Sequence, residues 1–158
     1  MKKGKTNAMR ILDKEKRKYE MLSYKADDGK IDGVSVANKI GKDVASVYKT
    51  LVSQGSSKAY YVFVIPVKAE LDLKKAAKAA GEKKMEMIPV KDITKITGYV
   101  RGGCSPIGMK KSFSTFLDQS ASLLDTIIVS GGMIGMQMEL KVEDLVGVTN
   151  ACYGDVRK

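Results

Sequence analysis

The sequence predicts an α+β fold, a single domain over residues 1–158 with six or seven strands and several short helices. Three observations lead to this prediction. Apolar runs of strand length are interspersed with short helical patterns in no regular βαβ order. Aliphatic and charged residues are mixed along the whole chain, which argues against disorder. The 158 residues are enough for one hydrophobic core, and no repeat or linker divides them.

The first half of the chain predicts two helices and three strands. Thr6 or Asn7 can cap a surface helix over 8–16. A strand at 19–24 and a turn at 26–30 precede a short helix at 33–40, which Gly41 ends. The apolar segments 44–52 and 59–66 then predict a hairpin around the loop 54–58. The second of them is nearly continuous in apolar residues, so we expect it in the sheet centre.

The second half predicts three helices and four strands. Alanines and lysines favour a helix over 71–80, which Gly81 ends. A strand at 83–87 and a short helix at 89–96 follow, and then come a glycine-rich loop and a strand at 112–117. The strand 125–130 is expected to break at Gly131 and Gly132. A strand at 136–140 and a short helix at 142–146 complete the prediction.

A strong positive charge favours a polyanionic partner. The chain has 28 Lys and Arg against 18 Asp and Glu, a formal net charge of +10. Such an excess favours nucleic acid first and a membrane surface second, although a merely soluble basic surface is the simpler explanation. If the fold gathers the basic clusters on one face, they would form a track for an RNA backbone. The clusters are Lys2-Lys3-Lys5, Lys14-Lys16-Arg17-Lys18, Lys74-Lys75-Lys78, Lys83-Lys84 and Lys110-Lys111.

The absence of histidine excludes several kinds of catalytic site. It removes Ser-His-Asp and Cys-His catalysis, as well as zinc sites with histidine ligands. Cys104 and Cys152, the two cysteines, have neither metal-binding spacing nor a disulfide pattern. We therefore expect no metal and a reducing cytoplasm. No apolar run is long enough to cross a bilayer, and the basic residues 1–5 are not followed by the apolar segment of a signal peptide.

The loop 97–111, the glycine loop, is the most informative stretch of the sequence. It contains four glycines and Pro106 and ends at Lys110 and Lys111, so several of its N–H groups can face an anion or a carbonyl oxygen. A tight surface turn is an equally good interpretation. The loop is not a P-loop, because Met109 precedes Lys110 and no Ser or Thr follows that lysine directly. The glycines at 131–135 also lack dinucleotide spacing, so we expect no cofactor.

Three side chains are candidates for chemistry. Lys49 lies in an otherwise apolar segment, where a charge is costly unless it faces solvent or a pocket. It can be an outward-facing lysine, or it can hold a phosphate or a developing oxyanion. Cys104 could be a nucleophile only if lysines or backbone dipoles activated it, so a packing role is favoured. Ser105 has no base nearby in the sequence.

Four blocks of sequence stand out, at 47–51, at 71–75, at 97–99 with 102–111, and at 129–132 with 139–140. Taken together, they resemble the bacterial YbaK/EbsC family of free-standing Cys-tRNA(Pro)/Cys-tRNA(Cys) deacylases. The family is similar to the editing domain inserted in bacterial prolyl-tRNA synthetases. The blocks occur in the family's order and spacing, and the match covers nearly the whole chain. They are Val47-Tyr48-Lys49-Thr50-Leu51, Leu71-Asp72-Leu73-Lys74-Lys75, Thr97-Gly98-Tyr99 with 102–111, and Val129-Ser130-Gly131-Gly132 with Glu139-Leu140.

The resemblance implies a mixed, mostly antiparallel and partly barrel-like sheet with flanking helices. It also implies an activity, the hydrolysis of the ester between a wrong amino acid and the tRNA 3′ end. By this resemblance Lys49, Gly102 and Gly103 are the expected catalytic residues, with Gly102 and Pro106 in a Gly-x-x-x-Pro loop that lines the substrate pocket. The expected substrate-binding residues are Tyr24, Thr50, Ser105, Pro106, Ser130, Gly131 and Gln137.

The family's mechanism needs no histidine. The thiol of the substrate cysteine attacks its own carbonyl and expels the tRNA hydroxyl, so the enzyme only positions the groups and stabilises the oxyanion. Gln137 stands where the best-known members have an acidic residue, and Asp32 stands where they have an aromatic one. The amino acid could therefore differ, as in Ala-tRNA(Pro). A non-enzymatic RNA-binding protein or a regulatory protein with this fold is the alternative, and prolyl-tRNA synthetase is a possible partner.

Overall fold

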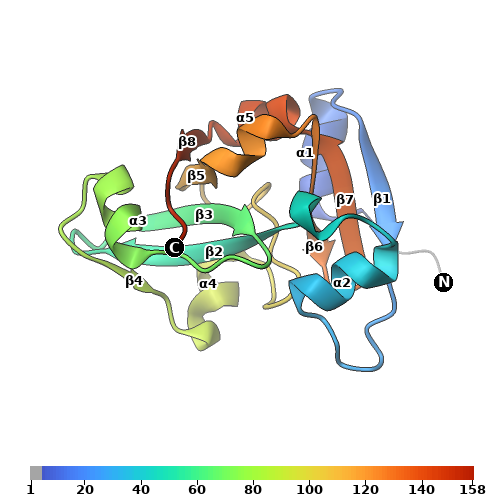
Figure 1. The fold of residues 1–158 in the computed structure, drawn as a ribbon, viewed down its shortest axis with the longest axis horizontal. Helices are drawn as coiled ribbons and strands as arrows, with labels where there is room; N and C mark the ends of the chain where they lie inside the picture. Colours follow the sequence, from blue (N-terminus) through green and yellow to red (C-terminus); the bar gives the residue numbers. More distant parts are fainter. Residues whose placement is uncertain (1–4) are drawn as a thin grey trace.

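The computed structural model describes residues 5–158 as a mixed α+β fold with two β-sheets, as the sequence predicts. A five-stranded sheet has the order β4-β2-β3-β5-β8, and a three-stranded sheet has the order β1-β7-β6 (Figure 1). Four strand pairs of the described chain are antiparallel, whereas β3–β5 and β5–β8 are parallel. The strands are β1 (Tyr19–Ser23), β2 (Tyr48–Gly55), β3 (Tyr60–Pro66), β4 (Met85–Met87), β5 (Ser114–Asp118), β6 (Thr126–Met133), β7 (Met136–Lys141) and β8 (Cys152–Gly154).

The helices are short, and capping residues mark their ends. Thr6 caps the first helix by accepting from the amide of Met9, as the sequence predicts. Gly41 and Gly81 end two later helices in the left-handed conformation, at the expected positions. The α-helices are α1 (Asn7–Lys14), α2 (Gly33–Ile40), α3 (Leu73–Ala80), α4 (Ile93–Thr97) and α5 (Val142–Thr149). The 3₁₀ helices are η1 (Val44–Ser46), η2 (Val90–Asp92) and η3 (Gln119–Leu123).

The structure differs from the prediction where local side-chain contacts or distant pairing decide the conformation. The expected strand at 44–52 begins only at Tyr48, because the Asp43 carboxylate accepts from the amide of Ala45 and starts η1. The expected helix at 89–96 divides into η2 and α4. The sequence prediction missed β8, which is three residues long and pairs with β5 across a long separation in the chain.

The expected break after residue 130 is wrong, because β6 continues through Gly131 and Gly132. The register with β7 shifts between Ser130 and Met133, so the glycines form a bulge inside the strand. Gly132 has φ +106°, and a Cβ there would lie 2.9 Å from the Cβ of Thr6. The glycines therefore allow a bulge and a close approach of α1, where the sequence suggested a strand end.

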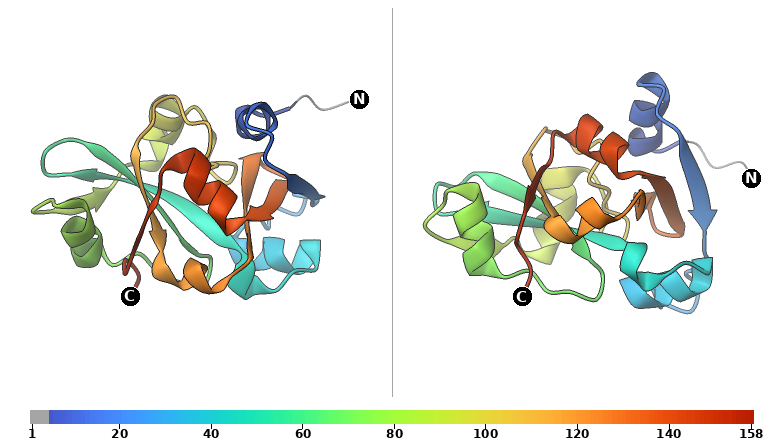
Figure 2. Two further views of the ribbon diagram at one scale, coloured as in Figure 1. Left: turned by 90° about the horizontal axis from the view of Figure 1, so that it is seen from above. Right: turned by 45° about the horizontal axis from the view of Figure 1, so that its top comes forward.

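The two sheets meet at the start of β2. Val47 and Ile128 form an isolated parallel bridge that joins them. The larger hydrophobic core contains side chains from both sheets, and a second core lies between β3 and α3. Figures 1 and 2 show the hairpin tip and α3 at one end of the molecule, and β1, β7 and α2 at the other. No helix of residues 5–158 is long and apolar enough to cross a membrane.

Glu82, which follows α3, anchors the hairpin between β2 and β3. Its carboxylate accepts from the amide and hydroxyl of Ser57, the hydroxyl of Ser56 and the hydroxyl of Tyr61. These hydrogen bonds lower the pKa of Glu82 to about 2, and the bond from the Ser57 hydroxyl contributes most to this shift.

This pKa predicts a defined loss of stability in acid. The folded-state pKa lies below the ordinary 4.5, so the carboxylate stabilises the fold above that pH and loses its effect as the pH falls towards 2. Glu82→Gln should therefore lower the free energy of unfolding at pH 7 and flatten its decline between pH 4.5 and 2. Urea unfolding of both proteins across this range measures the effect. Parallel pH profiles would contradict the assignment.

Candidate active site

A cavity of about 400 Å³ runs along one edge of β2. Six consecutive residues, 47–52, line it. Because successive side chains of a strand point to opposite faces, a cavity that contacts all six must lie along the strand's edge. The other lining residues come from several segments and are Ile31, Gly33, Val36, Val67, Met87, Ile88, Val90, Ile93, Arg101, Gly102, Cys104, Ser130 and Gln137.

The edge is open because β4 is short. On its other side β2 pairs with β3 along its whole length, from Tyr48 to Gln54. On the cavity side, β4 pairs only with residues 53–55 of β2. The cavity therefore occupies the place where a longer β4 would lie.

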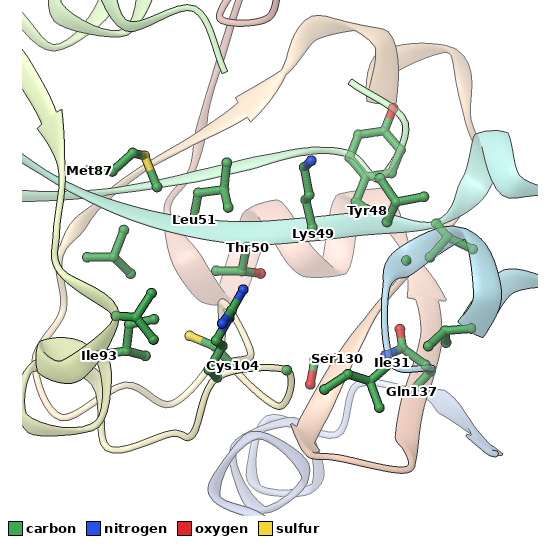
Figure 3. A pocket seen from close by; sticks show the side chains of 18 of the residues that line it. Ile31, Tyr48, Lys49, Thr50, Leu51, Met87, Ile93, Cys104, Ser130 and Gln137 are labelled. Atoms are coloured by element: carbon green, nitrogen blue, oxygen red, sulfur yellow. The ribbon is translucent and has the colours of Figure 1, made fainter. Parts of the chain in front are cut away.

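Five of the expected site residues line this cavity. They are Lys49, Thr50, Gly102, Ser130 and Gln137, which come from three regions of the chain that are far apart in sequence. Figure 3 shows Thr50 on the same side of β2 as Cys104, whereas the Lys49 side chain leaves β2 on the opposite side. Successive side chains of a strand point to opposite faces, so the neighbours Lys49 and Thr50 are expected on opposite sides of β2. The Lys49 ammonium group and the Cys104 side chain of the glycine loop thus lie on opposite sides of β2 (Figure 3).

Lys49 is partly buried, and this affects its charge. Desolvation lowers the pKa of its ammonium group below the ordinary value, and the nearby charge of Glu70 opposes this effect. Lys49 makes neither an ion pair nor a side-chain hydrogen bond with residues 5–158. An ammonium group that is partly desolvated and unpaired attracts an anion more strongly than a fully hydrated one.

The glycine loop contains two backbone amides without an acceptor in the described residues. Gly102 has φ +85°, and a Cβ there would lie 2.8 Å from the Cδ1 of Ile31, so only glycine fits. The amide of Gly103 donates to the carbonyl of Val100 and is not available. In contrast, the amides of Gly102 and Cys104 have no acceptor within residues 5–158. These two amides can therefore bind a carbonyl oxygen or an oxyanion.

Comparison with known proteins identifies the family of this chain. Residues 32–148 match the family model described as "Aminoacyl-tRNA editing domain". The chain is also 45% identical over 152 residues to a protein of Enterococcus faecalis (strain ATCC 700802 / V583) assigned as the Cys-tRNA(Pro)/Cys-tRNA(Cys) deacylase EbsC. That alignment covers 96% of this chain and 93% of the relative.

The chain belongs to the aminoacyl-tRNA editing domain family. Solved structures share its fold at low sequence identity. A structure assigned as a trans-editing enzyme for prolyl-tRNA synthetase has a TM-score of 0.84 at 22% identity and covers 99% of both chains. The protein APE2540 has a TM-score of 0.86 at 18% identity, with 97% of this chain and 100% of that chain covered.

The other expected site residues of this editing domain do not line the cavity. Ser105 is fully buried, and its hydroxyl accepts from the amide of Ile107, so it holds the loop. Pro106 is also buried in this loop. A Cβ on Gly103 would lie 2.8 Å from the backbone nitrogen of Ile134, so this glycine lets the loop pack closely on the β6–β7 turn.

Tyr24 and Gly131 also lie outside the cavity lining. The Tyr24 ring is buried beneath the ammonium of Lys39, which lies 5.9 Å from the ring centroid. Gly131 accepts a 2.5 Å hydrogen bond from the hydroxyl of Thr6 through its carbonyl. Asp32 caps α2 by accepting from Ser35, while its neighbours in the sequence line the cavity. These residues lie beside the cavity and do not line it.

The start of α1 connects β6 and the glycine loop. The hydroxyl of Thr6 donates to Gly131 of β6, and the amide side chain of Asn7 donates to the carbonyl of Gly108 at 2.7 Å. A Cβ on Gly108 would lie 3.1 Å from the backbone nitrogen of Ala8. The family model begins only at residue 32, so this connection belongs to a segment outside the matched region.

Two cavity residues bear directly on its chemistry. Arg101 lines the cavity and was not among the expected site residues, although a cation next to the glycine loop could have suggested it. Burial raises the pKa of the Cys104 thiol to about 11, so this cysteine stays protonated at neutral pH and is a poor nucleophile.

The charged groups of the chain show two further features. The basic residues of the cavity are Lys49 and Arg101, and neither belongs to a basic cluster of the sequence. Two members of those clusters, Lys2 and Lys3, lie outside the described residues. Within residues 5–158, no cluster of three or more His, Cys, Asp and Glu side chains could hold a metal ion.

Tyr99 supports the glycine loop from inside. It is buried, and its hydroxyl donates to the carbonyl of Ile107 at 2.7 Å, which joins the two ends of the loop. Tyr99→Phe removes this donor and leaves a buried carbonyl unpaired, at an expected cost of about 1–3 kcal/mol in the free energy of unfolding. Urea denaturation of the wild-type and Tyr99→Phe proteins measures this loss of stability.

Tyr153→Phe is the matched control, because Tyr153 is exposed and donates no side-chain hydrogen bond within residues 5–158. We expect this control to change the stability by no more than roughly 0.5 kcal/mol. Equal effects of the two substitutions would show that the loop does not depend on Tyr99.

Proposed function

We propose that this protein is a trans-editing aminoacyl-tRNA deacylase that hydrolyses mischarged Cys-tRNA(Pro), and also Cys-tRNA(Cys). One observation carries the proposal. The expected substrate contacts Lys49, Thr50, Gly102, Ser130 and Gln137 line a single cavity of about 400 Å³. This volume lies within the range of sites for small molecules. Family membership and the name of the 45% identical relative support the same reaction.

The substrate supplies the nucleophile in the proposed reaction. The sulfur of the bound cysteinyl group attacks its own carbonyl carbon, the ester C–O bond breaks, and the thiol proton passes to the leaving 3′ oxygen. The resulting thiolactone then reacts with water to give cysteine. The enzyme has no histidine and its Cys104 thiol is protonated, so a mechanism that needs only positioning and oxyanion stabilisation suits this cavity.

The two sides of the β2 edge have separate roles in this proposal. On the side of the glycine loop, the free amides of Gly102 and Cys104 stabilise the oxyanion that forms at the ester carbonyl. On the other side, the Lys49 ammonium binds the ribose or phosphate of the terminal adenosine. Ser130 and Gln137, which lie near each other in Figure 3, contact the aminoacyl group.

The biological role follows from the limits of amino acid selection. A synthetase separates amino acids of similar size poorly, so a second site that removes wrong products raises fidelity. We propose that the partner is aminoacyl-tRNA in the cytoplasm and that prolyl-tRNA synthetase helps to deliver it. The net charge of +10 favours binding to the tRNA backbone.

Lys49→Ala tests the proposed contact to the terminal adenosine. We expect Cys-tRNA(Pro) deacylation to fall about 10²-fold or more, the scale for loss of one transition-state contact, while the protein stays folded. Single-turnover deacylation and circular dichroism measure the two properties. Lys141→Ala is the control, because Lys141 is exposed at the end of β7, outside the basic clusters and the cavity lining. A folded Lys49→Ala protein with normal turnover would remove Lys49 from the site.

The nature of the nucleophile can be tested on one tRNA. Replacing cysteine with serine on tRNA(Pro) changes the sulfur to an oxygen and leaves the rest of the substrate nearly the same. Because a hydroxyl attacks far less readily than a thiol, we expect deacylation of the serine ester to stay close to the spontaneous rate. Equal acceleration of both esters would show that water or the protein provides the nucleophile.

A further inference from the structure

The hydrogen-bond pattern of β2 determines which backbone groups face the cavity. In an antiparallel pair, the two residues of a hydrogen-bonded pair exchange both bonds, and such pairs alternate with non-bonded ones. The amide of Val67 donates to the carbonyl of Val47, and the amide of Gly55 donates to the carbonyl of Ala59. Both belong to the β2–β3 register, so the odd-numbered residues of β2 direct their backbone groups to β3.

The even-numbered residues therefore direct their backbone groups to the open edge. Two further observations agree with this assignment. Pro66, which has no N–H, lies opposite Tyr48, where the pattern requires no bond to β3. The amide of Ile88 donates to the carbonyl of Val52 across the other edge. The N–H and C=O of Thr50 consequently point into the cavity.

Thr50 lies at the middle of the open edge. At one end of this edge Val47 forms its bridge with Ile128, and at the other Val52 accepts from Ile88. Between them, Thr50 has no strand pairing on this edge within residues 5–158. The side-chain Oγ1 of Thr50 is also buried without a hydrogen-bond partner there. Buried polar groups without partners are rare in folded proteins, and at a cavity such a group is available to contact a ligand.

We infer that the backbone of Thr50 binds the aminoacyl group as one residue of an antiparallel strand. The ammonium group of the amino acid donates to the Thr50 carbonyl, and the ester carbonyl accepts from the Thr50 amide. An α-amino ester carries one donor, the ammonium N–H, and one acceptor, the ester C=O, on the two sides of its Cα, as one residue of a strand does. This inference rests on the proposed function and names the part of the substrate that the β2 edge recognises.

The cavity then recognises the shared part of every amino acid and its variable side chain with different groups. A backbone pair contacts the α-ammonium and the carbonyl, which all amino acids share, so it cannot select between side chains. Selection then depends on the lining residues, including Ser130 and Gln137. The backbone contact also predicts that an acyl group without a free ammonium binds poorly, as a peptidyl-tRNA or an N-acetylated ester would.

Amide hydrogen exchange provides a direct test. The probe is adenosine with cysteine attached through a 3′ amide, which the protein cannot hydrolyse as an ester. Without the probe, the amide of Thr50 should exchange faster than those of Lys49 and Leu51, which pair with β3. At saturation it should slow by about fivefold or more, the factor for one net hydrogen bond. N-acetylation of the probe should weaken binding, and unchanged exchange at Thr50 under saturation would overturn the inference.

A backbone substitution tests the same contact through activity. Thr50→Val removes the hydroxyl and keeps the amide. An α-hydroxy acid in place of this valine then replaces the N–H by an ester oxygen, which also weakens the Lys49 carbonyl as an acceptor from β3. We expect this ester variant to lose about 10²-fold in deacylation relative to Thr50→Val. The same replacement at Phe63 of β3, which does not line the cavity, removes a bond to Leu51 and should lower stability with little effect on rate.

The two proposals fail in different ways. If the wild-type protein does not accelerate deacylation, the proposed function fails. If it does so and depends on Lys49, but the ester variant at residue 50 is as active as Thr50→Val, only the inference about the β2 edge is wrong.

Discussion

The missing strand pairing along β2 is the constraint on which the site depends. The β4 strand stops after pairing with residues 53–55 and β6 contributes only a bridge to Val47, so no strand pairs with this edge of β2 between them. Unpaired backbone groups are costly unless water or a ligand pairs with them. This edge places the side chains of both faces and the backbone of Thr50 in one cavity. A longer β4 would satisfy the backbone and remove the site.

The surrounding elements hold this opening in a fixed shape. Tyr99 joins the ends of the glycine loop, and Thr6 and Asn7 connect that loop to the bulge of β6. Each contact fixes backbone rather than a reacting side chain. This suits a reaction in which the substrate supplies the nucleophile, because fixed backbone dipoles stabilise a developing charge without reorganisation. It also explains how a site without histidine can serve catalysis.

The sequence predicts the local elements well and the long-range ones poorly. The helices that end at Gly41 and Gly81, and the central position of β3, follow from caps and apolar runs. The bulge at Gly131 and Gly132 could not be predicted, because these glycines also fit a strand end and only the contact with Thr6 decides. Likewise β8, which is three residues long, depends on pairing with β5.

In the candidate site too, the sequence predicts which residues matter but not how they are arranged in space. The family resemblance identified Lys49, Thr50, Gly102 and Ser130, and it named Gln137 as a departure from the family's pattern. Only the structure shows that the Lys49 side chain and Cys104 of the glycine loop lie on opposite sides of β2 (Figure 3). The most direct measurement is ester loss from Cys-tRNA(Pro), Cys-tRNA(Cys) and Ala-tRNA(Pro) with the wild-type protein. The account predicts that the cysteine esters are lost far faster than spontaneously. Salt-sensitive tRNA binding with ester loss only at the spontaneous rate would contradict it.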